Sequence, residues 1–188
     1  MIELKKNQRG FTLQEVMVMV FVIGLLSVLV SSVFVASNRV FRIVQASVDL
    51  QTDISRIQTL LQRDIRGAAA VSQYPEASPT YTSDDDTLVL RMASIETDGS
   101  IVPSTYDYII YTISGPGPYT LTREQVANGA GRNDSTQVLS KVLIDLTFMY
   151  DDTPITDATE VIADLALSKT YQSTPRSITA TIAAKLRN

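Results

Sequence analysis

The feature that most constrains this chain is its longest uncharged stretch, Val16 to Asn38. It contains 23 residues, mostly Val, Leu, Met, Ile and Phe. At about 1.5 Å per residue a helix of this length extends roughly 34 Å. The hydrocarbon core of a bilayer is about 30 Å thick and requires about 20 apolar residues. The stretch is too long for the apolar region of a signal peptide, which has about 7–15 residues. The sequence therefore predicts a membrane-spanning helix.

One acidic residue, Glu15, directly precedes the apolar stretch. A carboxylate at the centre of a membrane helix costs roughly 2.5 kcal/mol or more, but near the interface the cost is lower. Glu15 could thus be a flanking charge of an ordinary anchor. If the chain is cut between Gly10 and Phe11, a new α-amino group arises four residues before Glu15. The carboxylate could then pair with that amine on a neighbouring chain, strongly because water is scarce there.

Residues Gly10 to Val16 read Gly-Phe-Thr-Leu-Gln-Glu-Val and follow a short basic leader. This stretch resembles the processing site of type IV prepilins and type II secretion pseudopilins, and the resemblance covers Arg9 to about Asn38. It implies cleavage after Gly10 by prepilin peptidase and N-methylation of Phe11. It also implies filament assembly in which Glu15 contacts the Phe11 amine of an adjacent subunit.

The resemblance implies a structural subunit of a type II secretion pseudopilus or a type IV pilus. Its expected partners are other pilin or pseudopilin subunits, prepilin peptidase, the membrane and an inner-membrane assembly platform. The basic leader would remain in the cytoplasm. The chain would cross the inner membrane once, with its C-terminal domain outside, and then enter an extracytoplasmic filament.

Three features favour a minor subunit that starts or caps the filament. Major type IV pilins commonly have a proline 22 residues after the cut, where this chain has Ser32. Residues 49–69, with Asp64 before Gly67, are similar to the helix end of J-type minor pseudopilins and related minor pilins. Residues 138–152 are similar to a strand of those proteins.

The sequence divides into four segments: a leader peptide (1–10), a transmembrane and filament-core helix (11–38), an amphipathic helix that continues it (39–70), and a β domain (71–188). The first proline is Pro75, so no proline breaks the helix before Gly67, which could end it. An apolar stripe at helical spacing predicts one packed face. It comprises Ile43, Leu50, Ile54, Ile57, Leu61 and Ile65, widened by Val44 and Val48.

After residue 86, five or six runs alternate apolar and polar residues with turn signals between them. The clearest lies within residues 138–150 and is expected to place Val142, Ile144, Leu146, Phe148 and Tyr150 on one face. Such a pattern predicts a four- to six-stranded antiparallel sheet with one covered face. The apolar stripe of the helix is the expected cover, which gives an α+β, pilin-like fold. Residues 127–135 are expected to form a flexible loop.

Residues 72–86 have the composition of a surface loop. Asp84, Asp85 and Asp86 are weak calcium candidates because adjacent aspartates lack the alternating spacing of an EF-hand loop. A solvated turn is the expected role of these three residues. The tyrosines at positions 106, 108 and 111 could form a binding surface, but their spacing is more typical of packing within a sheet.

Composition argues against an enzyme. The chain has no His and no Cys, and neither a phosphate-binding loop nor a cluster of metal ligands is found, so no cofactor is expected. Serine–lysine chemistry remains formally possible, but Lys141, Lys169 and Lys185 are expected on solvated strand faces.

The net charge is −4. The leader contributes +2 through Lys5, Lys6 and Arg9 against Glu3, so the processed chain has −6, and no basic run remains to bind nucleic acid. Two alternatives stay open: a single-span, membrane-anchored binding domain that never polymerises, and a tip adhesin of a type IV pilus.

Overall fold

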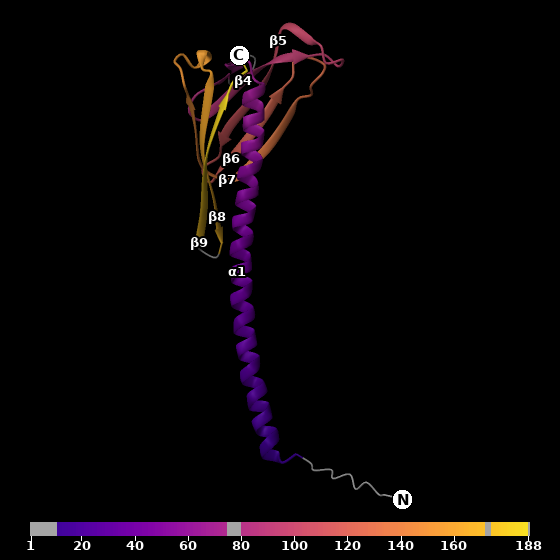
Figure 1. Cartoon of the computed structure of the whole chain (residues 1–188), viewed down its shortest axis with the longest axis vertical. Helices are drawn as coiled ribbons and strands as arrows, with labels where there is room; N and C mark the ends of the chain where they lie inside the picture. The colour runs from indigo at the N-terminus through magenta and orange to yellow at the C-terminus, as the bar shows by residue number, and fades with distance from the viewer. Residues whose placement is uncertain (1–10, 75–79, 172–173, 188) are drawn as a thin grey trace, which may run out of the picture. The chain divides into compact units, whose positions relative to one another are not determined.

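The computed structural model describes residues 11–74, 80–171 and 174–187. It has one long helix followed by β structure (Figure 1). The elements are α1 (Leu13–Gly67), β1 (Ala70–Val71), β2 (Gln73–Tyr74), β3 (Tyr81–Thr82), β4 (Thr87–Ile95), β5 (Ile101–Ser114), β6 (Tyr119–Val126), β7 (Ser135–Tyr150), the 3₁₀ turn η1 (Ile155–Asp157), β8 (Glu160–Tyr171) and β9 (Thr174–Lys185).

Helix α1 contributes to two structural units, which divide after Gln45. Its first part is almost uniformly exposed, whereas its last part, from Ala46 onward, places a stripe of apolar residues in the core. The buried members are Ala46, Leu50, Ile54, Ile57, Leu61 and Ile65. The predicted spacing is confirmed from Leu50 to Ile65; Ala46 was not predicted, and Ile43, which was, is only partly buried. Val44 and Val48 do not widen the stripe as expected, since they are 55% and 53% exposed.

The helix ends at Gly67 rather than continuing to residue 70. The amide of Ala68 donates to the carbonyl of Ile65, and the amide of Ala69 already donates to Arg91 in strand β4. Ala70 then begins β1. The chain therefore passes from helix to sheet within three residues, which fixes the end of α1 to the sheet edge.

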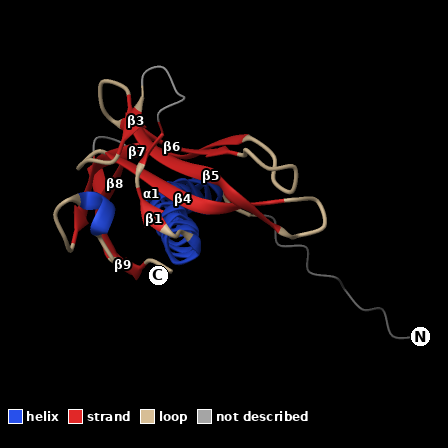
Figure 2. Ribbon diagram, turned by 90° about the horizontal axis from the view of Figure 1, so that it is seen from above, coloured by secondary structure: helices blue, strands red, loops and turns tan. Residues whose placement is uncertain are grey.

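The β strands form a seven-stranded antiparallel sheet in the order β1-β4-β5-β6-β7-β8-β9, and β2 pairs separately with β3. The strands curl around the last part of α1 (Figure 2). The expected count of four to six strands was too low, because β1 has only two residues and shows no periodicity. Strand β5 is a single strand of 14 residues. The α+β class is confirmed.

The core lies between the helix stripe and the inner face of the sheet. It includes Leu90, Tyr111, Leu121, Phe148 and Leu167, each at most 1% exposed. Burial of large apolar side chains of this kind contributes about 1.5–3 kcal/mol each.

Strand β7 departs from the alternation expected of it. Leu146 and Phe148 are buried as predicted, but Ile144 is 48% exposed and Leu143 is fully buried in its place. The register with β8 shifts between Leu143 and Asp145. A β-bulge adds one residue to a strand and moves the following side chains to the other face. The bulge explains why a simple period of two gave the wrong face for Ile144.

Candidate assembly site

The start of α1 is capped by its own side chains. The hydroxyl of Thr12 accepts a hydrogen bond from the amide of Glu15 (3.3 Å). In return, Oε2 of Glu15 accepts from the amide (2.9 Å) and the hydroxyl (3.1 Å) of Thr12. This reciprocal arrangement is a capping box, which satisfies amides that have no partner within the helix. The Thr-x-x-Glu spacing was visible in the sequence, but we did not predict its capping role.

Phe11 and Glu15 therefore lie together at the positive end of the helix dipole, where a carboxylate is favoured. The side chain of Phe11 is 72% exposed. Gly10, the other residue of the expected cleavage site, lies outside the described residues. Both hydrogen bonds that Glu15 accepts from Thr12 go to its Oε2 atom.

The apolar part of α1 is exposed along its length in the described part of its unit. This part of the helix is long and apolar enough to cross a membrane, and none of its most apolar stretch is buried. Two hydroxyls in this part bond within the helix, because Ser27 donates to the carbonyl of Ile23 and Ser32 to that of Leu29, both at 2.8 Å. An exposed apolar helix with internally satisfied polar groups is suited to a lipid bilayer or to packing with other apolar helices.

A buried ionic network joins the last helical turns to the sheet. Asp64 of α1 is 2% exposed, and its Oδ2 accepts from Arg123 Nε of β6 (2.6 Å) and from the Tyr111 hydroxyl of β5 (2.8 Å). Its Oδ1 accepts from the largely exposed guanidinium of Arg63 (2.9 and 3.0 Å). Burial, followed by the nearby charge of Asp64, raises the pKa of Tyr111 well above its ordinary value.

A second network lies at the other end of strands β4 and β5. Asp107 is 1% exposed and accepts from Ser94 (2.6 Å), from the amides of Asn128 and Gly129, and from the guanidinium of Arg132. Burial opposes ionisation of Asp107, but these hydrogen bonds outweigh it and lower the pKa of the carboxyl. The network ties the loop of residues 127–134 to the sheet, and the expected flexibility of residues 127–135 stays a prediction.

Neither network was predicted as a site. Both carboxylates are almost fully buried and are bonded to side chains or amides of neighbouring elements. Their role is to fix α1 and a loop to the sheet.

The three adjacent aspartates lie in a turn. Oδ1 of Asp84 accepts from the amides of Asp86 and Thr87, at 2.9 and 2.7 Å. Asp84 thus caps the turn that leads into β4. Within the described part of the chain, no group of three or more acidic, His or Cys side chains is arranged to hold a metal ion.

The tyrosines of β5 lie on two faces. Tyr111 faces the core, whereas Tyr108 packs on Tyr74 with ring centroids 4.9 Å apart and Tyr106 lies under the guanidinium of Arg91 at 4.6 Å. These contacts fit the expected role in sheet packing.

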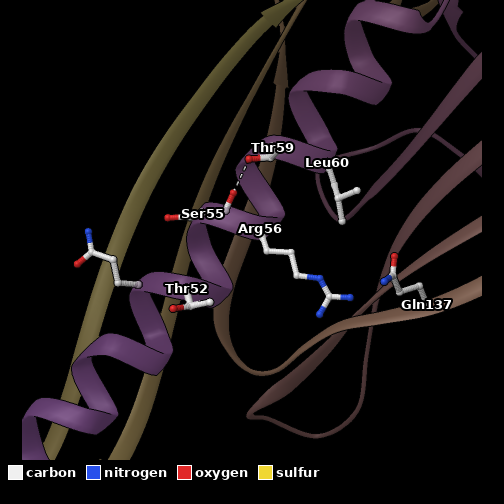
Figure 3. A pocket seen from close by; sticks show the side chains of 7 residues that line it. Thr52, Ser55, Arg56, Thr59, Leu60 and Gln137 are labelled. Carbon is white, nitrogen blue, oxygen red and sulfur yellow. Dashed lines mark hydrogen bonds between the residues drawn. The ribbon is translucent and has the colours of Figure 1, made fainter.

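A groove of about 590 Å³ lies beside the last part of α1 (Figure 3). Its lining residues are Gln51, Thr52, Ser55, Arg56, Thr59, Leu60 and Gln137. The hydroxyl of Thr59 is already used, since it donates to the carbonyl of Ser55 at 2.8 Å. The groove presents a cation, amides and hydroxyls but no carboxylate that could serve as a base.

No protein-family model, curated protein or solved structure matches this chain. The functional interpretation therefore depends on the residues at the helix start and on the helix itself.

Proposed function

We propose that this chain is a minor pilin or pseudopilin, a structural subunit of a type II secretion pseudopilus or a type IV pilus. In this proposal prepilin peptidase cleaves after Gly10, Phe11 is N-methylated, and the subunit joins the start or tip of the filament. One observation carries the proposal: the Gly-Phe-Thr-Leu-x-Glu pattern stands at the start of an unbroken apolar helix.

The exposed apolar part of α1 supports a route from membrane to filament. Lipid would cover this part before assembly, and the apolar helices of neighbouring subunits would cover it afterwards. Small residues allow helices in such a bundle to approach closely. Gly24 fits this role because no atom lies within 4 Å of the position that a Cβ would occupy there.

Glu15 would act at the moment of assembly. Cleavage would leave a charged amine on Phe11, next to the capping residue Thr12. Transfer of that amine into an apolar bundle is costly unless a carboxylate compensates it. One oxygen of Glu15 can maintain the cap while the other accepts from the Phe11 amine of an adjacent subunit.

The proposal is tested by replacing Glu15 with Ala in cells that carry the complete assembly machinery. The matched control is Gln14→Ala, since Gln14 is an exposed neighbour on the same helical turn. We expect both variants to reach the membrane, and we expect only Glu15→Ala to be lost from sheared filaments, by at least about tenfold on immunoblots. Equal recovery of the two variants would contradict the assembly role.

A single-span, membrane-anchored binding domain gives the opposite expectations. Its leader would remain attached, and its behaviour would not depend on Glu15. The same experiment therefore separates the two functions.

A further inference from the structure

Strand β9 is an edge strand of the seven-stranded sheet and pairs with β8 without a register shift. Just beyond it, the amide of Leu186 donates to the Thr159 carbonyl next to β8 (2.8 Å). The following amide, that of Arg187, donates in the opposite direction to the carbonyl of Ala68 (2.9 Å). Successive residues of an antiparallel edge strand alternate in this way. Even-numbered residues of β9 therefore bond to β8, and odd-numbered residues direct their amides and carbonyls outward.

The outward-directed backbone groups have no partner strand in the described part of the chain. They belong to the five odd-numbered residues from Ser177 to Lys185, whose side chains are all exposed. Pro175, which has no amide, also falls on the outward set. Among residues 11–74, 80–171 and 174–187, this edge has a main-chain partner in Ala68, which accepts from Arg187. The edge of β9 is thus a row of unused donors and acceptors.

Long free edges are usually protected by charged side chains, proline, bulges or a covering element, because they otherwise pair with other chains. On β9, proline and charge occur only near the two ends. The central outward positions, Ser177, Thr179, Thr181 and Ala183, carry small uncharged side chains. The middle of the edge is therefore open to the backbone of another strand.

Charge indicates what kind of strand fits. Residues 174–187 contain Arg176, Lys185 and Arg187 and no acidic residue, in a chain whose net charge is −4. All three basic side chains are exposed. A second copy of β9 would bring the same positive charges, whereas an acidic strand would be attracted.

We propose that the free edge of β9 binds an extended, acidic segment of a partner polypeptide, which adds an eighth strand to the sheet. Main-chain hydrogen bonds to the odd-numbered residues would hold the segment, and the basic residues at the ends of β9 would select acidic ends. This proposal goes beyond filament assembly and does not depend on the cleavage or on Glu15.

The test uses the full chain in lipid nanodiscs and an eight-residue peptide of alternating valine and threonine with a glutamate at each end. We expect saturable binding by fluorescence anisotropy and slower hydrogen exchange at the amides of Thr179 and Thr181. Replacing both glutamates by lysines should weaken binding at least about tenfold at low salt. Absence of binding, or equal binding of both peptides, would overturn the proposal.

Variants at one position separate backbone from side-chain effects. Thr179→Pro removes an outward amide and leaves the β8 ladder its bonds, so we expect binding to weaken at least about tenfold, whereas Thr179→Val should bind normally. Exchange at Ala180 reports whether the proline variant keeps its pairing with β8. If the proline variant loses its pairing with β8, two modified peptides are used in its place. One is N-methylated on its odd-numbered residues and the other on its even-numbered residues, so that one of them loses the amides that would bond to β9. Unchanged binding by the proline variant, or by both methylated peptides, would overturn the proposal.

Discussion

The sharpest test of the fold is removal of the Asp64 carboxylate. In Asp64→Ala the guanidinium of Arg123, 5% exposed, loses its buried counterion, and the Tyr111 hydroxyl loses its acceptor. Removal of one partner from a buried ion pair typically costs about 3–5 kcal/mol. Domains of this kind are stable by only about 5–15 kcal/mol. We therefore expect Asp64→Ala to lose a large fraction of the stability of the sheet unit.

Two further variants make the reasoning specific. Asp64→Asn keeps an acceptor but also leaves the Arg123 charge without a counterion, so we expect a loss close to that of Asp64→Ala, about 3–5 kcal/mol. In the double variant Asp64→Ala/Arg123→Met no charge remains buried, and most of the loss should be recovered. Asp145→Asn is the control, because Asp145 is exposed and a surface substitution usually changes stability by less than about 0.5 kcal/mol.

The assay is denaturant unfolding of the full chain in detergent micelles, followed by near-ultraviolet circular dichroism of the tyrosines. Recovery in the double variant would identify the uncompensated charge, rather than a cavity, as the cause of the loss. A loss below about 1 kcal/mol for Asp64→Ala would refute the reasoning, since it would match an exposed aspartate.

Three further predictions concern the same unit. Burial and then the charge of Asp64 raise the pKa of Tyr111 in the folded protein. The free energy of unfolding should therefore fall as the pH rises above about 10, the pKa of tyrosine in the unfolded chain. Tyr111→Phe should make this alkaline loss less steep when unfolding is measured as a function of pH. The lowered pKa of Asp107 has the opposite sign: its contribution is present above about pH 4 and is lost on acidification, so Asp107→Asn should flatten the acid limb of the same titration. Gly131→Ala should lower the stability measured by thermal unfolding by about 1–3 kcal/mol, because its Cβ would overlap the backbone of Ile95 and Glu96. In the control Gly99→Ala there is open space around the Cβ, so stability is lowered only by the positive φ of that residue. Equal losses of stability in the two variants would contradict the close packing of the 127–134 loop.

Much of the fold could be predicted from the sequence because its periodic signals are strong. The helix over the stretch from Val16 was predicted from its length and lack of charge, and the buried stripe from Leu50 to Ile65 from helical periodicity. Gly67 was the visible stop signal, and the helix ends there. The alternating runs identified the main strands for the same reason.

Other features could not be predicted because they depend on contacts between distant residues. Strand β1 is too short to show a pattern, and the bulge after Leu143 changes the face of Ile144 without any local marker. The pairing of Asp64 with Arg123 joins positions 59 residues apart. A single aspartate near a helix end is usually solvated, so its burial was not expected.

The proposed assembly site was inferred from the sequence for a different reason. The residues at the helix start are local in sequence, so the expected processing position and Glu15 could be identified without the fold. The Thr-x-x-Glu spacing was visible in the sequence, but the capping bonds between Thr12 and Glu15 became evident only in the structure.

The most direct test of the central claim is the intact mass of the membrane-extracted protein, measured with and without co-expressed prepilin peptidase. A known prepilin in the same cells serves as the control for peptidase activity. The account predicts loss of Met1 to Gly10 and one added methyl group on Phe11 only when the peptidase is present. An unchanged mass beside a fully processed control would contradict it, and residues 1–38 would then be an ordinary membrane anchor.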